Sequence, residues 1–525
     1  MKTPLLGRDN IKLLLIRPPY HLWPIINESD NFLLPLAYPC LGAYLKQKTK
    51  GIEVKAIDCL PLRIGWESLA GMIAEYNPDV VGVGDKVCYI HEGMRAVKIA
   101  KEINPGIVTV AGGHFHSHMP EYSLKNFCDL DFVVRFEGEE TFLELLETLR
   151  QGKSLSSVES IAYRDSDGSV AVTPPRPVID NLDDLPFPDY DLMPLNKYAP
   201  FGKLWPRAIT IQGARGCAYR CKFCSWTAVE GEHRLKDGRE VVIPRYRKKS
   251  VGRVIEEIDY LYTKHGIRYL FWVEGTWNHD HEWVNGLCEE IIRRGYKLGW
   301  WAFVRSDLLL EQEKLGILEK MVKAGLRHTL IGAERAEDEE LENLGKGKLR
   351  ANHLMEASHL MERKYPQVFR QATFTTGIRR ESKNSMRVLS KFSRDVHLDF
   401  AAFHPIMPWP GTPLWDEAQK EGWIEECDFS KFDMFYPVMS SDHLSREEIS
   451  RLSQNLYKDF VSKQPLRYLK GLFSIYPIRR RLHWWFLFSI TRVLFRDLWL
   501  SLLRKKKFEG FGAVNRLWKP RWYNS

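Results

Sequence analysis

Short apolar runs alternate with amphipathic patterns over residues 1–150. Runs typical of buried parallel strands occur at residues 11–16, 54–57, 80–83, 107–111 and 132–134. Patterns with helical spacing lie between or after them, at residues 36–48, 66–76, 93–103, 117–127 and 139–150. This alternation predicts a doubly wound, flavodoxin-like α/β domain over residues 1–153, and ligands of such domains bind beyond the carboxyl ends of the strands.

The pattern changes after that domain and then returns to alternation. Residues 154–204 are rich in proline and aspartate, which predicts a small strand pair and a linker. Six more strands are expected at residues 208–213, 269–273, 299–304, 328–332, 371–376 and 400–405, with helices between several of them. We therefore expect a partial (β/α)6 barrel over residues 205–430, followed by a helical C-terminal region at 431–525.

Composition narrows the protein class. A chain of 525 residues with 44% hydrophobic residues has material for two or three packed domains. A net charge of +9 is modest for this length and does not indicate a nucleic-acid partner. The nine scattered cysteines do not resemble a secreted disulfide framework, and residues 1–10 do not resemble a signal peptide, so a cytoplasmic protein is expected.

Three cysteines directly follow the first expected barrel strand. Cys217, Cys221 and Cys224 lie within eight residues of one another. Thiolates hold iron–sulfur clusters, and three local ligands leave one iron of a [4Fe–4S] cluster open to another molecule. A zinc site is the competing interpretation, but the following residues up to 240 offer only His233 as a further ligand of the usual kind.

The spacing Cys-x3-Cys-x2-Cys in this context resembles the radical S-adenosylmethionine (SAM) superfamily. The resemblance implies that the open iron binds the amino and carboxylate groups of SAM, which is cleaved reductively to a 5′-deoxyadenosyl radical. Phe223 matches an aromatic position near the adenine, although ordinary core packing is the alternative. Glu274 and Glu334, which end the second and fourth expected barrel strands, correspond to acidic positions near SAM. Arg335 stands where the family usually has serine, and no catalytic residue is assigned.

The loops after the fourth and fifth strands of the first domain resemble those of cobalamin-binding radical SAM proteins. The matching positions are Gly112, Gly113, His114, Arg135, Glu137 and Gly138. The resemblance implies that these residues contact cobalamin. The chain lacks the Asp-x-His-x-x-Gly signature, so cobalt would have no lower histidine, and residues 85–91 would form the loop below the corrin. The alternative is a regulatory or nucleotide-binding flavodoxin-like module.

Two later segments extend the interpretation. Residues 408–414 resemble the Pro-Gly-Thr-Pro-Leu turn of B12-dependent radical SAM proteins, in a structural role. The pattern of residues 479–507 predicts a basic, aromatic-rich amphipathic helix with a polar, solvent-exposed stripe through Ser489, Arg492 and Arg496. Such a helix either lies in a membrane interface or packs onto the barrel.

The resemblance favours a methyltransferase that uses methylcobalamin and a 5′-deoxyadenosyl radical to methylate an unactivated carbon of a hydrophobic substrate. An external one-electron reductant, flavodoxin or ferredoxin, would supply electrons to the cluster. The first alternative is an oxidative cyclase acting on a tetrapyrrole, because residues 407–413 and 436–439 resemble the anaerobic cyclase of bacteriochlorophyll synthesis. The second alternative is a non-catalytic cobalamin or redox sensor.

Overall fold

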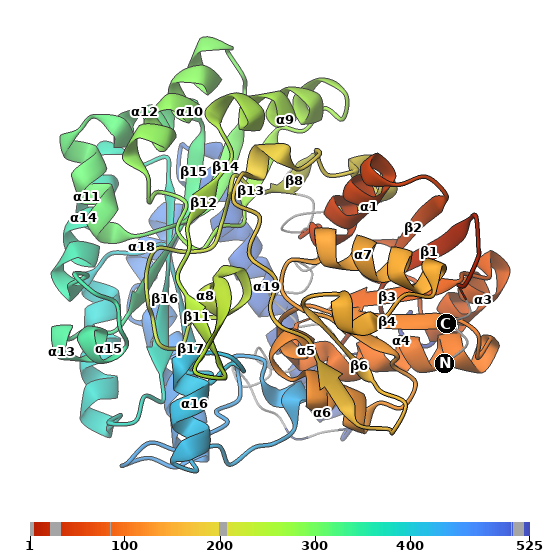
Figure 1. Ribbon diagram of the computed structural model, residues 1–525. Helices are drawn as coiled ribbons and strands as arrows, with labels where there is room; N and C mark the ends of the chain where they lie inside the picture. The colour runs from red at the N-terminus through yellow and green to blue at the C-terminus, as the bar shows by residue number, and fades with distance from the viewer. Residues whose placement is uncertain (1–4, 22–32, 85, 199–206, 506, 508–518) are drawn as a thin grey trace.

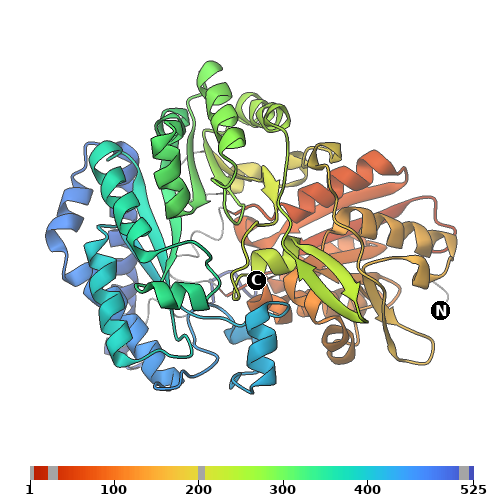
Figure 2. The same cartoon turned by 60° about the vertical axis from the view of Figure 1, so that its left-hand side comes forward.

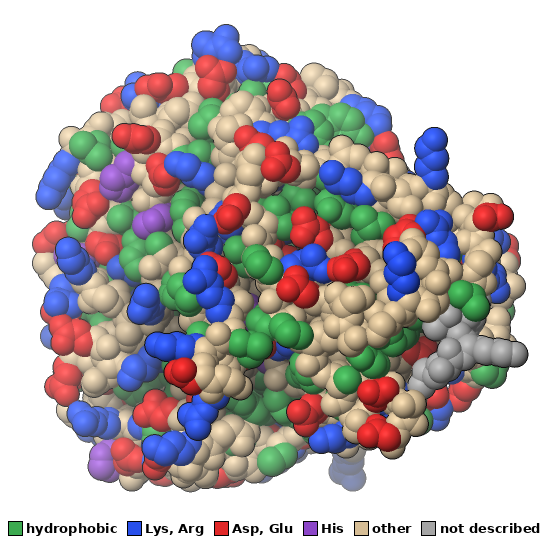
Figure 3. Space-filling model, viewed as in Figure 1, with side chains coloured by type: hydrophobic (Ala, Val, Ile, Leu, Met, Phe, Trp, Pro, Cys, Tyr) green, Lys and Arg blue, Asp and Glu red, His purple; other side chains and the backbone are tan. Residues whose placement is uncertain are grey.

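Two large, mainly parallel β-sheets lie side by side and form the two main bodies of the molecule (Figure 1). The computed structural model describes residues 5–21, 33–84, 86–198, 207–505, 507 and 519–525. The N-terminal sheet and its helices occupy one side of the view, and the second sheet with its helices occupies the other. On the face drawn in Figure 3, basic and acidic side chains are interspersed rather than gathered by sign.

The N-terminal sheet confirms the flavodoxin-like prediction. Its strand order is β2-β1-β3-β4-β5-β6-β7. The five parallel strands are β1 (Ile11–Arg17), β2 (Ile52–Asp58), β3 (Val80–Gly84), β4 (Val108–Gly112) and β5 (Phe132–Val134). The predicted strand pair after residue 154 consists of β6 (Ile161–Arg164) and β7 (Val170–Val172), which add to this sheet as antiparallel strands. The pair therefore extends the first domain instead of standing alone in the linker.

Helices cover both faces of this sheet. On one face lie α1 (Ala37–Lys48) and α7 (Gly138–Gln151), which pack against alternate residues of β1. The other face carries α3 (Trp66–Tyr76), α4 (Ile90–Ile103) and α6 (Pro120–Asn126). The short helices α2 (Cys59–Leu62) and α5 (His114–His118) follow strands β2 and β4. The single helix expected at 117–127 is thus divided into α5 and α6, because Pro120 begins a new helix at its first turn.

The second sheet is a six-stranded parallel sheet, as a partial barrel requires. Its order is β17-β16-β15-β14-β13-β8. The strands are β8 (Ala208–Ile211), β13 (Tyr269–Trp272), β14 (Gly299–Val304), β15 (Leu326–Glu334), β16 (Phe369–Thr376) and β17 (Phe400–Pro405). All six coincide with the expected apolar runs, which are near-continuous because both faces of the sheet are covered.

Helices cover the outer face of this barrel (Figure 2). They are α9 (Val251–Thr263), α10 (His281–Arg293), α11 (Ser306–Lys314), α12 (Ile317–Ala324), α14 (Ala351–Lys364) and α15 (Lys383–Asp395). The short helices α13 (Asp338–Asn343) and α16 (Pro413–Lys420) follow the strands β15 and β17 in the chain. Side-chain caps fix several starts, for example Ser250 at α9 and Asp280 at α10. Helix α17 (Arg446–Ser462) packs on β17, where the Tyr457 hydroxyl oxygen accepts a hydrogen bond from the backbone N–H of Phe403.

The first βα connection of the barrel contains small elements that periodicity did not predict. They are β9 (Ala214–Arg215), α8 (Ser225–Glu230), β10 (Glu232–Lys236), β11 (Arg239–Ile243) and β12 (Arg247–Lys248). Strands β10 and β11 form an antiparallel hairpin, and β9 pairs with β12. These strands are two to five residues long, too short to give a hydrophobic period.

The C-terminal region is helical, with α18 (Pro465–Leu472) and α19 (Pro477–Leu502) after α17. Helix α19 lies behind the barrel strands in Figure 1 and packs Trp485, Phe486 and Val493 against residues of β8, β13 and β16. The prediction that Ser489 lies on a solvent-exposed polar stripe was wrong, because Ser489 is buried. This side of the helix packs against the barrel, and an apolar side is exposed instead. Within the described part of the chain, no helix is both long and apolar enough to cross a bilayer.

Residues 519–525 return to the N-terminal domain. The carbonyl groups of Tyr523, Asn524 and Ser525 accept hydrogen bonds from the first N–H groups of α3. These N–H groups have no partner within their own helix, and the Gly65 N-cap has no side chain to supply one. The segment therefore caps α3 and ties the second half of the chain to the first domain.

Candidate functional site

The three cysteines lie on a loop that is fixed on two sides. Gly216 precedes it with a φ of +78°, in the left-handed region, and a Cβ there would overlap the carbonyl group of Arg245. At the centre of the loop, Lys222 donates its N–H to the carbonyl group of Leu344, after β15, and accepts one from Leu414. The loop is thus held between two barrel connections before any cofactor is bound.

The three thiols interact electrostatically with one another, and two cations lie close by. Burial raises the pKa of Cys221 and brings that of Cys224 to about 12, and the neighbouring cysteines raise both pKa values further. Lys346 and Arg305 counteract this effect at Cys221. Positive charge beside a set of thiolates suits an anionic iron–sulfur cluster, in which each cysteine binds a different iron.

The described residues contain no group of three or more His, Cys, Asp or Glu side chains arranged around a single metal ion. Gly345 brings the chain close to the cysteine loop, since a Cβ there would come within 2.6 Å of the Arg220 carbonyl oxygen. This glycine has a φ of +75° and allows the close approach that the loop needs.

Glu334 ends β15 in a strained position next to this loop. Its φ of +60° is unusual for a residue with a side chain, and the pairing of β15 with β16 shifts register here. Its carboxylate accepts hydrogen bonds from Lys346 Nζ at 3.0 Å and Thr375 Oγ1 at 2.7 Å. Backbone strain held by such contacts is typical of functional sites. The structure therefore brings Glu334 near Cys221, and its contact with SAM stays a prediction.

Glu274 lies two residues after the end of β13 and is almost entirely buried. Its Oε1 accepts hydrogen bonds from the backbone N–H groups of Gly213 and Ala214, after β8. Its Oε2 is buried without a hydrogen-bond partner, and burial raises the pKa of this carboxyl to about 8. The neighbouring Thr276 hydroxyl lies 3.8 Å from Cys217 Sγ. An orphaned carboxylate oxygen at this place fits the ammonium group of SAM.

Phe223 and Arg335 have mainly structural contacts in this structure. Phe223 packs at the edge of an apolar cluster formed by Leu344, Ile378 and Leu414, which fits the core-packing alternative. Arg335 is fully buried and forms ion pairs with Glu340 and Glu381, which explains how the chain accommodates arginine at a position where the family usually has serine.

Sequence reasoning missed Lys346 and Arg305 as neighbours of the cysteines and Glu334. Arg305 lies over the Tyr219 ring at 3.8 Å and forms an ion pair with Asp307. Neither residue belongs to a motif with a fixed spacing. Only their placement at the ends of strands or in the following loops offered a signal.

Residues 408–414 contact both the cysteine loop and the N-terminal domain. The N–H of Leu414 binds the cysteine loop, and the Pro410 carbonyl lies 2.7 Å from His114 Nε2. Gly411, at a φ of +82°, lies against the His118 ring so closely that a Cβ would overlap it. The predicted structural turn therefore also bridges the two domains.

The charged residues of the cobalamin motif face the second domain. Arg135 donates hydrogen bonds to the Ser117 carbonyl and to Glu240 of β11. Glu137 forms ion pairs with Arg215 and Arg247 and accepts a hydrogen bond from the backbone of residue 179. Burial would raise the pKa of Glu137, but the two guanidinium groups outweigh it and hold the pKa below its usual value. Cobalamin contact by these side chains stays a prediction.

The backbone around this motif explains its glycines. Phe136 has a φ of +62°, a backbone conformation that favours glycine, and its ring stacks on His233 at a centroid distance of 3.5 Å. That stacking and a hydrogen bond from the Phe136 N–H to Ser117 Oγ compensate for the left-handed backbone. Gly138 begins α7, where a Cβ would meet Leu41 at 3.3 Å.

The carboxyl ends of β3 and β4 present bare backbone near the second domain. At Gly84 and Gly112 an added Cβ would meet its nearest atoms only at 3.9 Å and 3.4 Å. Gly113 is exposed, with a φ of +89°, and leads into α5 and the histidine that contacts Pro410. Such a surface fits a bulky ligand that approaches the backbone closely.

The loop expected below the corrin is only partly described. Asp85 lies outside the described residues. After it, Tyr89 is buried and stacks on Tyr20 at 4.0 Å, while Val87 packs with Phe429 and Phe432 of the second domain. The loop is thus anchored at the interface between the domains.

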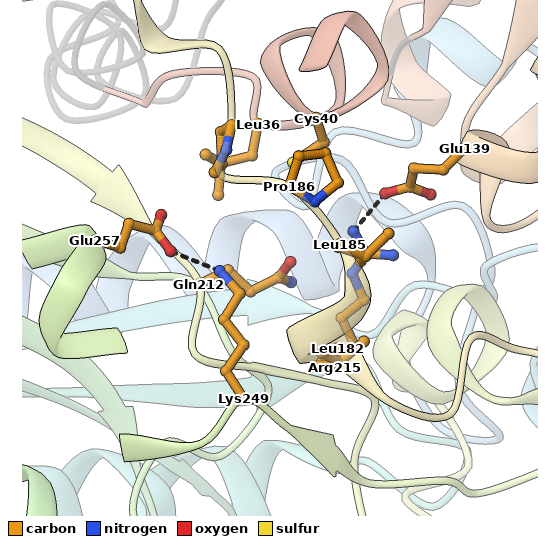
Figure 4. Close-up of a pocket in the computed structure, with 11 residues that line it drawn as sticks. Leu36, Cys40, Glu139, Leu182, Leu185, Pro186, Gln212, Arg215, Lys249 and Glu257 are labelled. Atoms are coloured by element: carbon orange, nitrogen blue, oxygen red, sulfur yellow. Dashed lines mark hydrogen bonds and ion pairs between the residues drawn. The ribbon is translucent and has the colours of Figure 1, made fainter. Parts of the chain in front are cut away.

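A narrow cavity also lies between the domains (Figure 4). It is lined by residues of α1, α7, the linker and the barrel, and its charged side chains pair with each other as Arg215–Glu139 and Lys249–Glu257. The volume open to water in this cavity is about 20 Å³, which is room for about one water molecule. This cavity is therefore not the cofactor site.

Two family models match the chain in the expected order. Residues 22–146 match the B12 binding domain, and residues 211–392 match the radical SAM superfamily. An uncharacterized methyltransferase of Pyrococcus horikoshii is 30% identical over 471 residues, which is 88% of this chain and 95% of that protein.

Two other comparisons cover most of the chain. The anaerobic magnesium-protoporphyrin IX monomethyl ester cyclase of Rubrivivax gelatinosus is 29% identical over 470 residues, 87% of this chain and 79% of the cyclase. The radical SAM methyltransferase TsrM of Kitasatospora setae, solved with cobalamin and a [4Fe-4S] cluster bound, superposes with a TM-score of 0.65 at 15% identity, covering 92% of this chain and all of TsrM. At that identity the likeness shows the fold.

Proposed function

The chain belongs to the B12-binding radical SAM enzymes, which work with a [4Fe–4S] cluster, SAM and cobalamin, and we propose that it methylates an unactivated carbon of a hydrophobic small molecule. The observation that carries the proposal is the shared contact of residues 408–414 with the cysteine loop and with His114 at the N-terminal strand ends. The methyltransferase relative that spans nearly the whole chain supports the same reaction.

In this proposal Cys217, Cys221 and Cys224 hold the cluster. The orphaned Oε2 of Glu274 accepts a hydrogen bond from the ammonium group of SAM. When bound, SAM and the cluster supply a 5′-deoxyadenosyl radical that removes a substrate hydrogen, and cobalamin supplies the methyl group.

The remaining residues orient and balance this chemistry. Lys346 and Arg305 keep positive charge beside the cysteine loop, and Lys346 also fixes the carboxylate of Glu334. Gly84, Gly112 and Gly113 would admit cobalamin against the backbone, with His114, Arg135, Glu137 and Gly138 around it. Phe223 would line the adenine side.

Isotope transfer tests the proposal. Cells with and without the gene are grown anaerobically with trideuteromethyl-methionine, and their lipid and pigment extracts are compared by mass spectrometry. We expect at least one compound that carries the intact trideuteromethyl group only when the gene is present. The purified, cofactor-loaded chain should also form 5′-deoxyadenosine from SAM under dithionite, and Cys224→Ala should form none. Gene-dependent products without the label would refute methyl transfer.

A second candidate reaction is oxidative cyclisation of a tetrapyrrole. The cyclase relative, 29% identical over 470 residues, favours it. The same experiment separates the two reactions, because cyclisation transfers no methyl group to the product. A gene-dependent pigment that lacks the label, with 5′-deoxyadenosine still formed, would select the cyclase.

The proposal extends to organisation and partners. The cobalamin-binding unit spans residues 1–153, and the strand pair β6–β7 of the following segment, 154–204, extends its sheet. The barrel spans residues 205–430 and the helical C-terminal region 431–525. An external one-electron donor of the flavodoxin or ferredoxin class reduces the cluster. The enzyme works in the cytoplasm in peripheral contact with the inner face of the membrane, where a hydrophobic substrate partitions.

A further inference from the structure

Exposed apolar side chains gather on the C-terminal helices. Among the described residues, 12 of the 21 exposed large hydrophobic side chains lie between Leu466 and Leu503. Soluble proteins seldom expose apolar residues at this density without a partner. The rest of the described chain has the other nine, scattered from Leu6 to Tyr436.

These side chains form one stripe along α19. Most of their intervals are three, four or seven residues, the spacing of a single helix face: Trp484, Phe488, Phe495, Leu498, Trp499 and Leu502. Phe488 and Phe495 are 71% and 72% exposed. The opposite face is anchored, because Asp399 at the start of β17 forms an ion pair with Arg479, and Trp485 and Phe486 pack in the barrel. The helix therefore cannot turn its stripe inward.

Helix α18 continues the apolar surface beside the start of α19. Leu466, Leu469 and Phe473 are exposed on it, and Ile475 follows at 79% exposure. The two helices contact each other, and the Trp484 indole donates a hydrogen bond to the Leu472 carbonyl. The surface thus spans a helix pair rather than one helix.

The charge around this surface is one-sided. Residues 464–507 contain eleven Lys and Arg and a single acidic residue, Asp497, which is buried. A helix with an apolar stripe of Trp, Phe and Leu and flanking cations lies in the interface of an anionic bilayer. A second protein surface would have to offer both a long apolar groove and a matching acidic rim.

A basic pocket opens beside the first turn of α19. It is lined by Ile478 of that turn, by Tyr269, Tyr296 and Leu298, and by five cations. Four of the cations lie at the amino ends of barrel strands and Lys323 lies on α12; the five are Arg207, Arg268, Lys297, Lys323 and Arg327. The volume open to water in this pocket is about 480 Å³. In the described part of the chain only Lys323 among these has a carboxylate partner, Glu319. The pocket has the size and charge for a phosphate-bearing headgroup.

We propose that the α18–α19 surface docks on an anionic phospholipid membrane, with one lipid headgroup in the pocket of Arg207, Arg268, Lys297, Lys323 and Arg327. The inference rests on the peripheral membrane contact of the proposed function and is independent of which reaction the enzyme performs. The pocket supplies preference for anionic lipid, and the apolar stripe supplies most of the affinity.

Vesicle sedimentation of the cofactor-loaded full chain tests the docking. We expect wild type to pellet with phosphatidylcholine vesicles that contain phosphatidylglycerol, and more weakly with pure phosphatidylcholine. Phe488→Glu with Phe495→Glu should lower partitioning to both by about tenfold or more. Leu235→Glu with Leu315→Glu, a matched pair of exposed positions elsewhere, should bind like wild type.

The pocket is tested by a second pair. Lys297→Glu with Lys323→Glu should remove the preference for phosphatidylglycerol, whereas Lys98→Glu with Lys420→Glu, an equal charge change at exposed sites elsewhere, should keep it. All four double variants should form 5′-deoxyadenosine at the wild-type rate, which separates loss of docking from loss of the reaction. Wild type that stays in the supernatant with both vesicles would overturn the proposal. A stable dimer in solution that Phe488→Glu with Phe495→Glu dissociates would also overturn it.

Discussion

Replacement of Glu137 tests whether this carboxylate holds the two domains together. In the structure it is buried between Arg215 and Arg247, with N–O distances of 2.9 Å, and accepts a further backbone hydrogen bond from the linker. Removing one partner of a buried ion pair typically costs about 3–5 kcal/mol. Arg215 keeps its second partner, Glu139, so we expect Glu137→Ala to lower the free energy of unfolding by about 3 kcal/mol.

Glu137→Gln keeps an acceptor but loses the charge, and should cost about 1.5 kcal/mol at neutral pH. Because the folded-state pKa of Glu137 lies below its usual value of 4.5, its stabilising effect is complete above pH 4.5. The difference between wild type and Glu137→Gln should therefore shrink as the pH falls through the folded pKa.

The measurement is equilibrium urea unfolding, followed by tryptophan fluorescence and circular dichroism so that coincident transitions can be checked. Glu140→Ala is the control, since this neighbouring carboxylate is 44% exposed and should cost at most about 0.5 kcal/mol. A Glu137→Ala protein as stable as wild type that no longer binds cobalamin would refute the interdomain role and favour direct contact with the cofactor.

Three further substitutions test the site. Cys224→Ala should lose most iron and acid-labile sulfide after anaerobic purification, whereas Cys128→Ala, at an exposed cysteine, should keep both; equal iron in the two would remove the cluster assignment. Gly411→Ala should cost about 2 kcal/mol more stability in thermal unfolding than Gly422→Ala, because both glycines have positive φ but only the first lacks room for a Cβ; equal losses would contradict the tight packing. Burial raises the pKa of Glu274 to about 8, so the folded state loses stability relative to the unfolded state as the pH rises from about 4.5 toward 8. In urea unfolding, Glu274→Gln should therefore be more stable than wild type at pH 8 and lose that advantage at pH 5. A stability difference that does not change with pH would contradict the raised pKa.

The sequence was sufficient for the two sheets because their strands are buried on both faces. Runs such as residues 80–83 and 400–405 are continuous and apolar, which leaves little ambiguity. The cysteine loop could also be predicted from the sequence, because its three thiols lie close together along the chain. The hairpin of β10 and β11 was not, since its short strands give no period and its packing depends on the N-terminal domain.

Contacts between distant segments could not be predicted. Arg135 and Glu137 matched a cofactor motif, yet their partners lie about 80–110 residues further along the chain. In the C-terminal helix, alternation of polar and apolar residues could not reveal which side meets the barrel. Ser489 and Asp497 are buried there because Asp399 and the inner strand residues fix the helix in that orientation.

The turn at residues 408–414 also determines how the protein can be recombined. It follows the last barrel strand in sequence, but in space it belongs equally to the N-terminal half through His114 and His118. In a chimaera that takes only its first 200 residues from a relative, the loop with His114 and His118 would come from the relative. The turn at residues 408–414, which that loop contacts, would come from this chain. Transplants should therefore carry residues 408–438 and the 232–243 hairpin together with the N-terminal half, because compatibility follows this surface rather than a single cut in the chain.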